Sequence, residues 1–302
     1  MAEIRTEMIA ANGLEFETDM AGDGDKLALF LHGFPENSQS WHAQLRLLAD
    51  MGYTAWAPNL RGYKGTSRPK GVDAYAIEAL MDDVAALIDA SGKTDVTLIV
   101  HDWGGVIGWF FMMRKLRPVS RFIVLNIPHP KLMAAQMSSR RQLLKSWYIF
   151  FFQLPWLPEF MLRRGGAKGF RRIFRDTALN KANFPDSHID HFARPALEPG
   201  ALTPMINYYR ALVRGGGGRR MEKLGFPVID TPTLMLWGTA DMALDVSTTT
   251  ETHTQVSDLT LRYLPGVSHW IQQDAPHTVN RMIKAWLTGE PVAEITETDT
   301  ID

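Results

Sequence analysis

Short apolar runs alternate with segments of helical periodicity over most of the chain. The amphipathic segments Ile77–Ala90, Gly104–Leu116 and Thr278–Leu287 predict helices. Continuous apolar strands separated by such helices are typical of a mostly parallel sheet that is flanked by helices on both faces. The pattern therefore predicts the α/β fold class. The predicted strands are Leu27–Leu31, Thr54–Pro58, Val96–Val100, Phe122–Asn126, Thr233–Trp237 and Leu259–Leu264.

The two ends of the chain depart from this alternation. Met8–Ala21 predicts a β-hairpin that turns on Asn12 and Gly13, because Asn-Gly suits the positive φ angles of a two-residue turn. The residues before it carry scattered acids and no apolar stretch, unlike a secretory signal peptide. Residues 290–302 are acidic and have few large apolar groups, so we expect a disordered tail there.

The middle of the chain, residues 131–224, has no pattern of buried strands and predicts an inserted helical cap. The insertion divides an α/β core into residues 1–130 and 225–302. Residues 131–230 contain 17 Lys and Arg against 7 Asp and Glu, whereas the remainder contains 15 against 26. This charge split indicates two structural units. The most apolar stretch, Trp147–Leu162, is shorter than the roughly 20 residues of a membrane span and contains two prolines, so we expect it to be buried or to line a pocket.

Composition narrows the classes of function. The 302 residues are 45% hydrophobic and 22% charged with a formal net charge of -1, which gives no overall reason to expect nucleic acid or a membrane as partner. The sequence has no cysteine, which excludes disulfides, thiolate metal sites and a cysteine nucleophile. His188 and His191 lack further ligands nearby and predict a solvated helix face rather than a metal site. We expect a cytoplasmic monomer or homodimer without cofactor or metal.

Asp102 is the first candidate for chemistry. It ends the apolar run in LIVHDWGG, and a carboxylate at the end of a buried strand costs free energy unless it is used. The two glycines after Trp103 permit a sharp strand-turn-helix elbow that would raise the Asp102 side chain into a cleft. The alternative is a helix N-cap, a common role for aspartate.

Three further segments supply partners for Asp102. In LHGFPE the turn places the amide N–H of Phe34 toward the same cleft, and with the amide of Trp103 it would form a two-donor oxyanion hole. WGTAD and GVSHW each follow a predicted strand and contribute Asp241 and His269, in the chain order nucleophile, acid, histidine. Asp245 is a rival to Asp241. The alternative roles are structural: a tight loop for LHGFPE, a turn cap for Asp241 and a surface position for His269.

The motifs HGFPE, RGYKGTSRP, VHDWGG, WGTADMAL and GVSHW resemble, in order and spacing, the epoxide hydrolases of the α/β-hydrolase superfamily, its branch with an aspartate nucleophile and a helical cap. The resemblance implies that Asp102 is the nucleophile, His269 the general base and Asp241 its orienting acid. Haloalkane and haloacetate dehalogenases share the aspartate. The sequence departs from the pattern of this family at two positions. Val100 stands two residues before Asp102, where the family often has glycine, and Lys64 interrupts the usual RGYG.

The insertion favours the epoxide hydrolases. Asn207-Tyr-Tyr-Arg resembles their cap motif and implies a ring-opening role for Tyr209, and the segment from Lys145 implies a second such role for Tyr148. Two phenols suit the chemistry because an opening epoxide develops an alkoxide that two O–H donors stabilise. The alternative is that Tyr148 and Tyr209 are both aromatic residues of the core with no role in catalysis.

An apolar substrate pocket is expected around these groups, suited to an aryl or alkyl epoxide. Its cap residues would be Trp147, Phe150, Phe151, Phe152, Trp156 and Met205. The full set of expected pocket residues nearest the chemistry is Phe34, Pro35, Trp103, Phe151, Phe152 and Trp270. Three functions therefore stand: an epoxide hydrolase, a dehalogenase and a non-catalytic receptor for small molecules.

Overall fold

A computed structural model describes residues 2–137, 139–299 and 301–302. Eight strands form one sheet in the order β1-β2-β4-β3-β5-β6-β7-β8. β1 and β2 pair antiparallel, β2 pairs antiparallel with β4, and the pairs from β4 to β8 are parallel. The predicted α/β fold class is confirmed. The strands are β1 (Arg5–Ala11), β2 (Leu14–Ala21), β3 (Lys26–Leu31), β4 (Tyr53–Pro58), β5 (Val96–His101), β6 (Arg121–Leu125), β7 (Thr233–Gly238) and β8 (Leu259–Leu264).

The strands β3 to β7 are buried on both faces of the sheet, which explains their continuous apolar runs. In β5, Leu98 and Val100 belong to one apolar cluster and Ile99 to the other, because successive strand residues point to opposite faces. The first cluster includes residues of α2 (Ile77–Ser91) and α3 (Asp102–Arg114). The second includes residues of α1 (His42–Asp50) and α12 (Pro276–Thr288). The short α11 (Ile271–Asp274) precedes α12.

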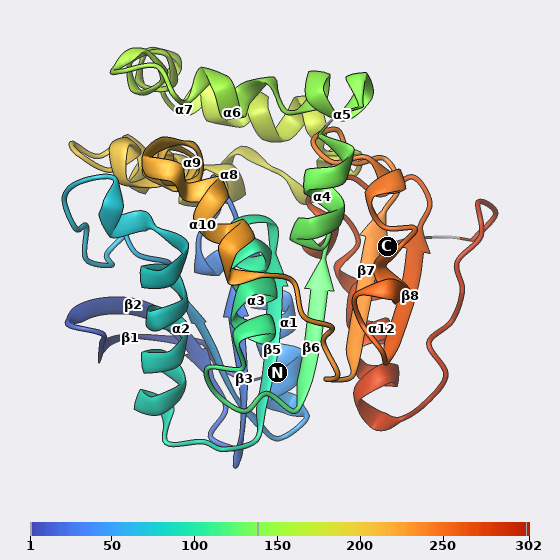
Figure 1. Cartoon of the computed structure of the whole chain (residues 1–302). Coiled ribbons are helices and arrows are strands. Elements are labelled where there is room, and N and C mark those ends of the chain that lie inside the picture. The colour runs from blue at the N-terminus through green and yellow to red at the C-terminus, as the bar shows by residue number, and fades with distance from the viewer. Residues whose placement is uncertain (1, 138, 300) are drawn as a thin grey trace.

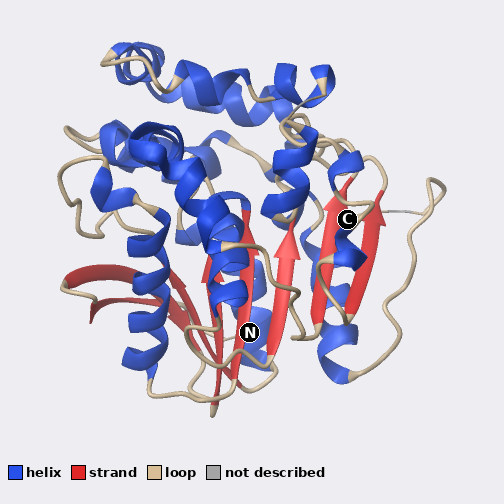
Figure 2. Cartoon of the chain, in the orientation of Figure 1, coloured by secondary structure: helices blue, strands red, loops and turns tan. Residues whose placement is uncertain are grey.

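Seven helices lie between β6 and β7 and cover the carboxyl ends of the parallel strands (Figures 1 and 2). Gly166 interrupts the longest of them with a φ of 54°. Gly216, with a φ of 75°, turns the chain from the ninth helix into the tenth, within the glycine run at 215–218. These helices are α4 (Pro130–Gln136), α5 (Arg140–Lys145), α6 (Trp147–Phe151), α7 (Leu157–Thr177), α8 (Asp186–Leu197), α9 (Leu202–Val213) and α10 (Gly217–Leu224).

The C-terminal segment differs from the expected disordered tail. Val292 is buried in the second apolar cluster, and its carbonyl accepts a hydrogen bond from Arg262. Asp302 accepts hydrogen bonds from Thr278 and Arg281. The few apolar residues of this segment, spaced among acids, are enough to anchor it against the core.

The apolar stretch Trp147–Leu162 is only half buried, which corrects the expectation that it lies inside the protein. Phe152 is buried, whereas Trp147, Phe150 and Trp156 are 63%, 52% and 69% exposed. The short helices here have one face on the protein and one on solvent, although both faces are apolar. In the described residues, no helix has the combination of length and hydrophobicity that crossing a bilayer requires.

Candidate active site

Asp102 lies at a strained turn between β5 and α3. Its φ of 47° is in the left-handed region, which a residue other than glycine or asparagine adopts at a cost. Gly104 permits the turn, because a Cβ there would lie 2.2 Å from the carbonyl oxygen of Leu31. The Asp102 side chain is 15% exposed. This is the strand-turn-helix elbow that the sequence predicted, and backbone strain of this kind is often found at functional sites.

The loop after β3 approaches the elbow closely. The amide N–H of Phe34 donates to Oδ1 of Asp102 at 2.8 Å. Gly33 makes this possible, since a Cβ there would lie 2.4 Å from Cβ of Asp102. Trp103 is in the first turn of α3, where amide groups have no acceptor within the helix. Pro35, next to Phe34, is buried.

His269 joins the two carboxylates of the site. Its Nδ1 lies 2.7 Å from Oδ2 of Asp241, and its Nε2 lies 3.7 Å from Oδ2 of Asp102. The geometry therefore pairs His269 with Asp241 rather than Asp245. Asp245 instead caps a short helical turn by accepting from the amide of Ser247, and it lies 3.6 Å from Nζ of Lys145.

Asn126, which the sequence analysis treated only as a strand end, fixes Asp241. Its side-chain amide donates to Oδ2 of Asp241 at 2.8 Å, and its side-chain oxygen accepts from the amide of Gly238. The amides of Ala243 and Leu244 donate to the other carboxylate oxygen at 2.7 and 2.8 Å. A fully buried carboxylate with this many donors keeps its charge and its orientation.

Glu36 is a second residue whose role the sequence analysis missed. It is 1% exposed, and its Oε2 lies 2.9 Å from Nδ1 of His101. The other ring nitrogen of His101 lies 2.9 Å from the carbonyl oxygen of His269. Gln272 and Gln273 donate to Oε1 of Glu36. His101 therefore holds the backbone of the loop that carries His269, and Glu36 anchors it. The only sequence signal for Glu36 was its place in HGFPE.

His32 has a different environment and is neutral. Its Nδ1 lies 2.9 Å from the carbonyl oxygen of Gly33, and its Nε2 accepts from the amide of Leu60 at 3.0 Å. Complete burial, the main cause, lowers the pKa of His32 to about 4. His32 therefore holds the loop that carries Phe34.

The charges of the site depend on one another. Burial raises the pKa of Asp102, but the hydrogen bond and charge of His269 lower it more, so the pKa lies below the usual range. The pKa of Asp241 is likewise lowered against the effect of burial, chiefly by the charge of His269. Burial lowers the pKa of His269, yet the two carboxylates raise it well above its ordinary value. The resting site therefore contains an imidazolium between two carboxylates.

Two tyrosines of the cap lie close enough to Asp102 for its negative charge to act on their phenols. Tyr209 on α9 and Tyr148 on α6 have ring centroids 5.8 Å apart. Burial, and then the negative charge of Asp102, raise the pKa of both phenols above the ordinary value. Both groups therefore remain O–H donors at any physiological pH.

The neighbouring Tyr208 points away from this site. Its hydroxyl donates to the carbonyl oxygen of Arg61 at 2.8 Å, and its ring packs against Tyr63 and Tyr75. Because adjacent helical residues point about 100° apart, only one of the two can face Asp102. The structure places Tyr209 there.

Aromatic rings fill the space between the tyrosines and the elbow. The Tyr209 ring contacts the rings of Phe34, Trp103 and Phe152 at centroid distances of 5.4, 5.0 and 4.9 Å. Phe151 is adjacent and partly buried. Trp270 has a different position: its indole N–H donates to Thr177 and its ring packs on Phe174 of the cap.

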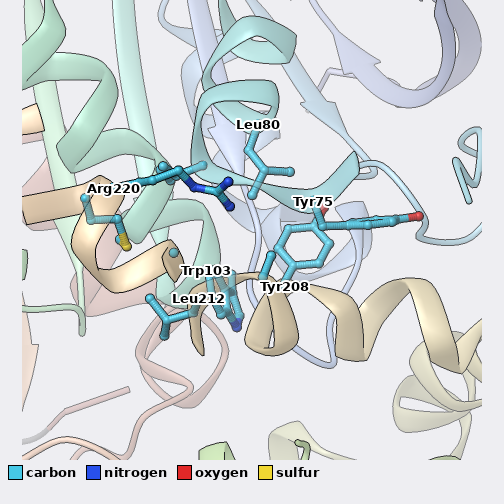
Figure 3. Close-up of a pocket in the computed structure, with 10 residues that line it drawn as sticks. Tyr75, Leu80, Trp103, Tyr208, Leu212 and Arg220 are labelled. Atoms are coloured by element: carbon cyan, nitrogen blue, oxygen red, sulfur yellow. The ribbon is translucent and has the colours of Figure 1, made fainter. Parts of the chain in front are cut away.

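A small pocket lies beside this cluster, and Trp103 lines both (Figure 3). None of Asp102, His269 and Tyr209 lines it. The expected cap residues Trp147, Phe150 and Trp156 are not part of it either and are exposed. The residues shown in the pocket are Tyr75, Ile77, Leu80, Trp103, Tyr208, Ala211, Leu212, Gly217, Arg220 and Met221.

Arg210 connects the two tyrosine-bearing helices. It is 5% exposed, and its guanidinium donates to both oxygens of Glu159 and to the carbonyl oxygens of Phe152 and Leu154. It thereby fixes the segment after α6 against α9. Burial raises the pKa of Glu159, but its hydrogen bonds, above all the one from Arg210, together with the charge of Arg210 lower it more, so the pKa lies below the ordinary value.

Replacing Arg210 by methionine is expected to destabilise the fold, because it leaves Glu159 and two carbonyls without their buried partner. A broken buried ion pair costs about 3–5 kcal/mol, to be measured by urea unfolding. Arg214→Met is the control, since Arg214 is exposed and donates only to the Gln153 carbonyl. Glu159→Gln/Arg210→Met should recover part of the loss. Equal effects of Arg210→Met and Arg214→Met would contradict this interpretation.

Comparison with known proteins places the chain in a family. The alpha/beta hydrolase fold family matches residues 28–276. Epoxide hydrolase 4 of Homo sapiens is 35% identical, over 93% of this chain and 78% of that protein. The AB hydrolase superfamily protein YfhM of Bacillus subtilis is 33% identical, over 96% of this chain and all of that protein.

A solved epoxide hydrolase structure from Bacillus megaterium superimposes with a TM-score of 0.85 at 28% identity, over 93% of this chain and all of that one. An epoxide hydrolase A structure from Mycobacterium thermoresistibile gives 0.81 at 26% identity, with 96% of this chain and all of that one covered. The resemblance inferred from the motifs is thus confirmed. Fold, buried elbow and relatives agree that this chain belongs to the α/β-hydrolase fold family, among its epoxide hydrolases.

Proposed function

We propose that this protein converts an apolar epoxide and water to a vicinal diol through a covalent ester on Asp102. One observation carries the proposal: an ionised carboxylate at a strained elbow lies 3.7 Å from His269 and faces two phenols of the cap. The names of its epoxide hydrolase relatives support it.

The first step suits a carboxylate better than a serine. The electrophile is an sp³ carbon, and an ionised carboxylate attacks it without help from a general base. The Oδ2 of Asp102 bonds to the epoxide carbon while the C–O bond of the ring breaks. Tyr148 and Tyr209 hydrogen-bond to the departing oxygen and stabilise its charge. One phenol gives this oxygen a proton and is reprotonated by the proton that the His269 imidazolium loses once Asp102 is esterified. The product is a hydroxyalkyl ester of Asp102.

The second step hydrolyses this ester. Neutral His269, held by Asp241, removes a proton from water, and the hydroxide adds to Cγ of Asp102. The amides of Phe34 and Trp103 stabilise the resulting oxyanion. The bond from Cγ to Oδ2 then breaks, and the diol leaves with Oδ2 as its new hydroxyl oxygen after it takes the proton of the carboxyl group that forms on Asp102. The carboxylate, now with one oxygen from water, and the imidazolium of His269 are restored.

Product analysis tests the proposal directly. The purified protein is incubated with racemic styrene oxide and, separately, with 1-bromobutane, and diol and bromide are measured. Diol without bromide, lost in Asp102→Ala, is the expected result. Bromide without diol would assign the site to a dehalogenase. If neither product forms, the result contradicts a catalytic role with substrates of these classes. The cytoplasmic location and the oligomeric state stay predictions.

Replacing Tyr148 and Tyr209 together by phenylalanine is expected to slow ester formation by about 10³-fold or more, because each removed donor costs about 10²–10³. Each single variant should lose less, since one phenol remains. The measurement is single-turnover ester formation with styrene oxide. Tyr208→Phe is the control, because its hydroxyl bonds Arg61 instead. A double variant that keeps most of the rate would reject this assignment of the cap.

The two steps are expected to depend differently on pH. Ester formation requires ionised Asp102, whose pKa is lowered, and protonated phenols, whose pKa values are raised, so its rate should stay flat from about pH 6 to 9. Ester hydrolysis requires neutral His269. In the ester the charge of Asp102 is gone while that of Asp241 remains, so the pKa of His269 falls from its high resting value. Hydrolysis should therefore accelerate with rising pH and then level off.

Rapid mixing followed by acid quench separates the two rates. The approach to the ester level reports ester formation, and decay of the ester after substrate is exhausted reports hydrolysis. A formation rate that falls between pH 6 and 9 would contradict the assigned phenols. A hydrolysis rate that decreases with rising pH would contradict a neutral histidine base.

A further inference from the structure

Large apolar side chains are concentrated on the outer surface of the cap. Of the thirteen exposed large hydrophobic residues in the described part of the chain, eight lie between residues 143 and 161 and are 43–75% exposed. Contiguous exposed apolar surface on a water-soluble fold usually marks an interaction site. We call this set the cap patch: Leu143, Leu144, Trp147, Phe150, Leu154, Trp156, Phe160 and Met161.

The cap patch belongs to α5, α6 and the start of α7, which form the layer of the cap farthest from the sheet (Figures 1 and 2). The helix α6 has two functions in one turn: Tyr148 faces the active site, while Trp147 and Phe150 face outward. Trp156 is turned out by a backbone φ of 51°. No core requirement explains tryptophans in these positions.

The surface around the cap patch is strongly basic. Residues 131–175 contain ten Lys and Arg and one acidic residue, Glu159, which is paired with Arg210. Three of the ten, Arg171, Arg172 and Arg175, pair with aspartates of α7 and α8. Arg163, Arg164 and Lys168 on α7 have no acidic partner among the described residues, and Arg164 lies 6.0 Å from the centre of the Phe160 ring. The net charge of -1 for the whole chain hides this local excess.

We propose that the cap patch binds the surface of a lipid bilayer that contains anionic lipids. Trp, Phe and Leu inserted at the headgroup level, with Lys and Arg beside them, are the chemistry of peripheral membrane attachment. A second copy of this chain is disfavoured, because a symmetric dimer would bring two such basic faces together. The proposal revises the expectation of no membrane partner. It does not rest on the proposed function, since binding is measured without catalysis.

Co-sedimentation with vesicles tests the proposal on the full chain. Vesicles of phosphatidylcholine with an equal part of phosphatidylglycerol are compared with vesicles of phosphatidylcholine alone. We expect binding to the anionic vesicles at least tenfold tighter than to the neutral ones, and we expect it to weaken as salt screens the charges. Trp147→Ser/Phe150→Ser/Trp156→Ser should bind at least tenfold more weakly to both, and Arg163→Gln/Arg164→Gln/Lys168→Gln should lose the anionic preference.

Two control variants match these in number and exposure but lie elsewhere. Met8→Ser/Val228→Ser/Met242→Ser removes exposed apolar side chains, and Lys70→Gln/Lys223→Gln/Lys284→Gln removes exposed charges. Both should bind like the unmodified protein, and all variants should unfold at nearly the same temperature. The proposal fails if anionic vesicles do not bind the protein, or if the controls lose as much affinity. A dimer in light scattering that the three serine changes dissociate would instead assign the cap patch to a second copy.

Discussion

Replacing Asp102 by alanine is expected to abolish epoxide hydrolysis, with a loss of at least about 10⁴-fold in kcat, the scale of a removed nucleophile. The other carboxylate of the site cannot replace it, because Asp241 is fully buried and its oxygens are bonded to His269, Asn126 and two backbone amides. The measurement is diol formation from styrene oxide by chromatography.

Two controls protect this prediction from a folding artefact. Asp102 has a positive φ, which alanine adopts poorly, so Asp102→Asn is tested beside it because asparagine tolerates the left-handed region. Thermal unfolding should show both variants folded. Diol formation by a folded Asp102→Asn, with its mass still that of the amide, would show that the carboxylate is not the nucleophile.

Replacing His269 by glutamine is expected to stop the reaction at the ester. Glutamine cannot accept the proton of water, so hydrolysis should slow by about 10²–10⁴-fold, whereas attack by Asp102 needs no base. Incubation with styrene oxide should therefore increase the mass of the protein by one substrate molecule. Intact-mass spectrometry measures this, and digestion locates the adduct on the peptide that contains Asp102.

His191→Gln is the matched control, because His191 is an exposed histidine of α8. It should turn over and show no adduct. If His269→Gln binds substrate and loses activity but accumulates no covalent adduct, then His269 acts before the ester forms. That result would contradict the two-step scheme. An adduct on another residue would move the nucleophile.

The residues that the sequence could place share one property: their position follows from strand ends. Asp102, Asp241 and His269 each lie in the turn or loop that follows a parallel strand, and parallel strands bring their carboxyl ends to one edge of the sheet. Apolar continuity marks such strands plainly. The order of motifs then pointed to the family, which the relatives confirm.

The residues that only the tertiary structure revealed depend on contacts between distant segments. Asn126 and Asp241 are 115 positions apart, and Glu36 and Gln272 are 236 apart, so no local pattern announces either hydrogen bond. The choice between Asp241 and Asp245 needed the 2.7 Å contact with His269. The cap motif implied Tyr209 rather than its sequence neighbour Tyr208, and the packing of α9 gives the physical reason, because the Tyr208 hydroxyl donates to the carbonyl oxygen of Arg61.

Burial in the cap was the property hardest to predict from sequence. An apolar run such as Trp147–Leu162 lies inside a protein when other elements cover it, and periodicity does not say whether they do. In this fold the short α6 belongs to the outer layer of the cap, so Trp147 and Phe150 have no cover. The sequence by itself thus determined the sheet, its edge and the chemical groups along it. The tertiary structure decided which groups meet there and which apolar surface remains exposed, because both depend on how separate segments pack.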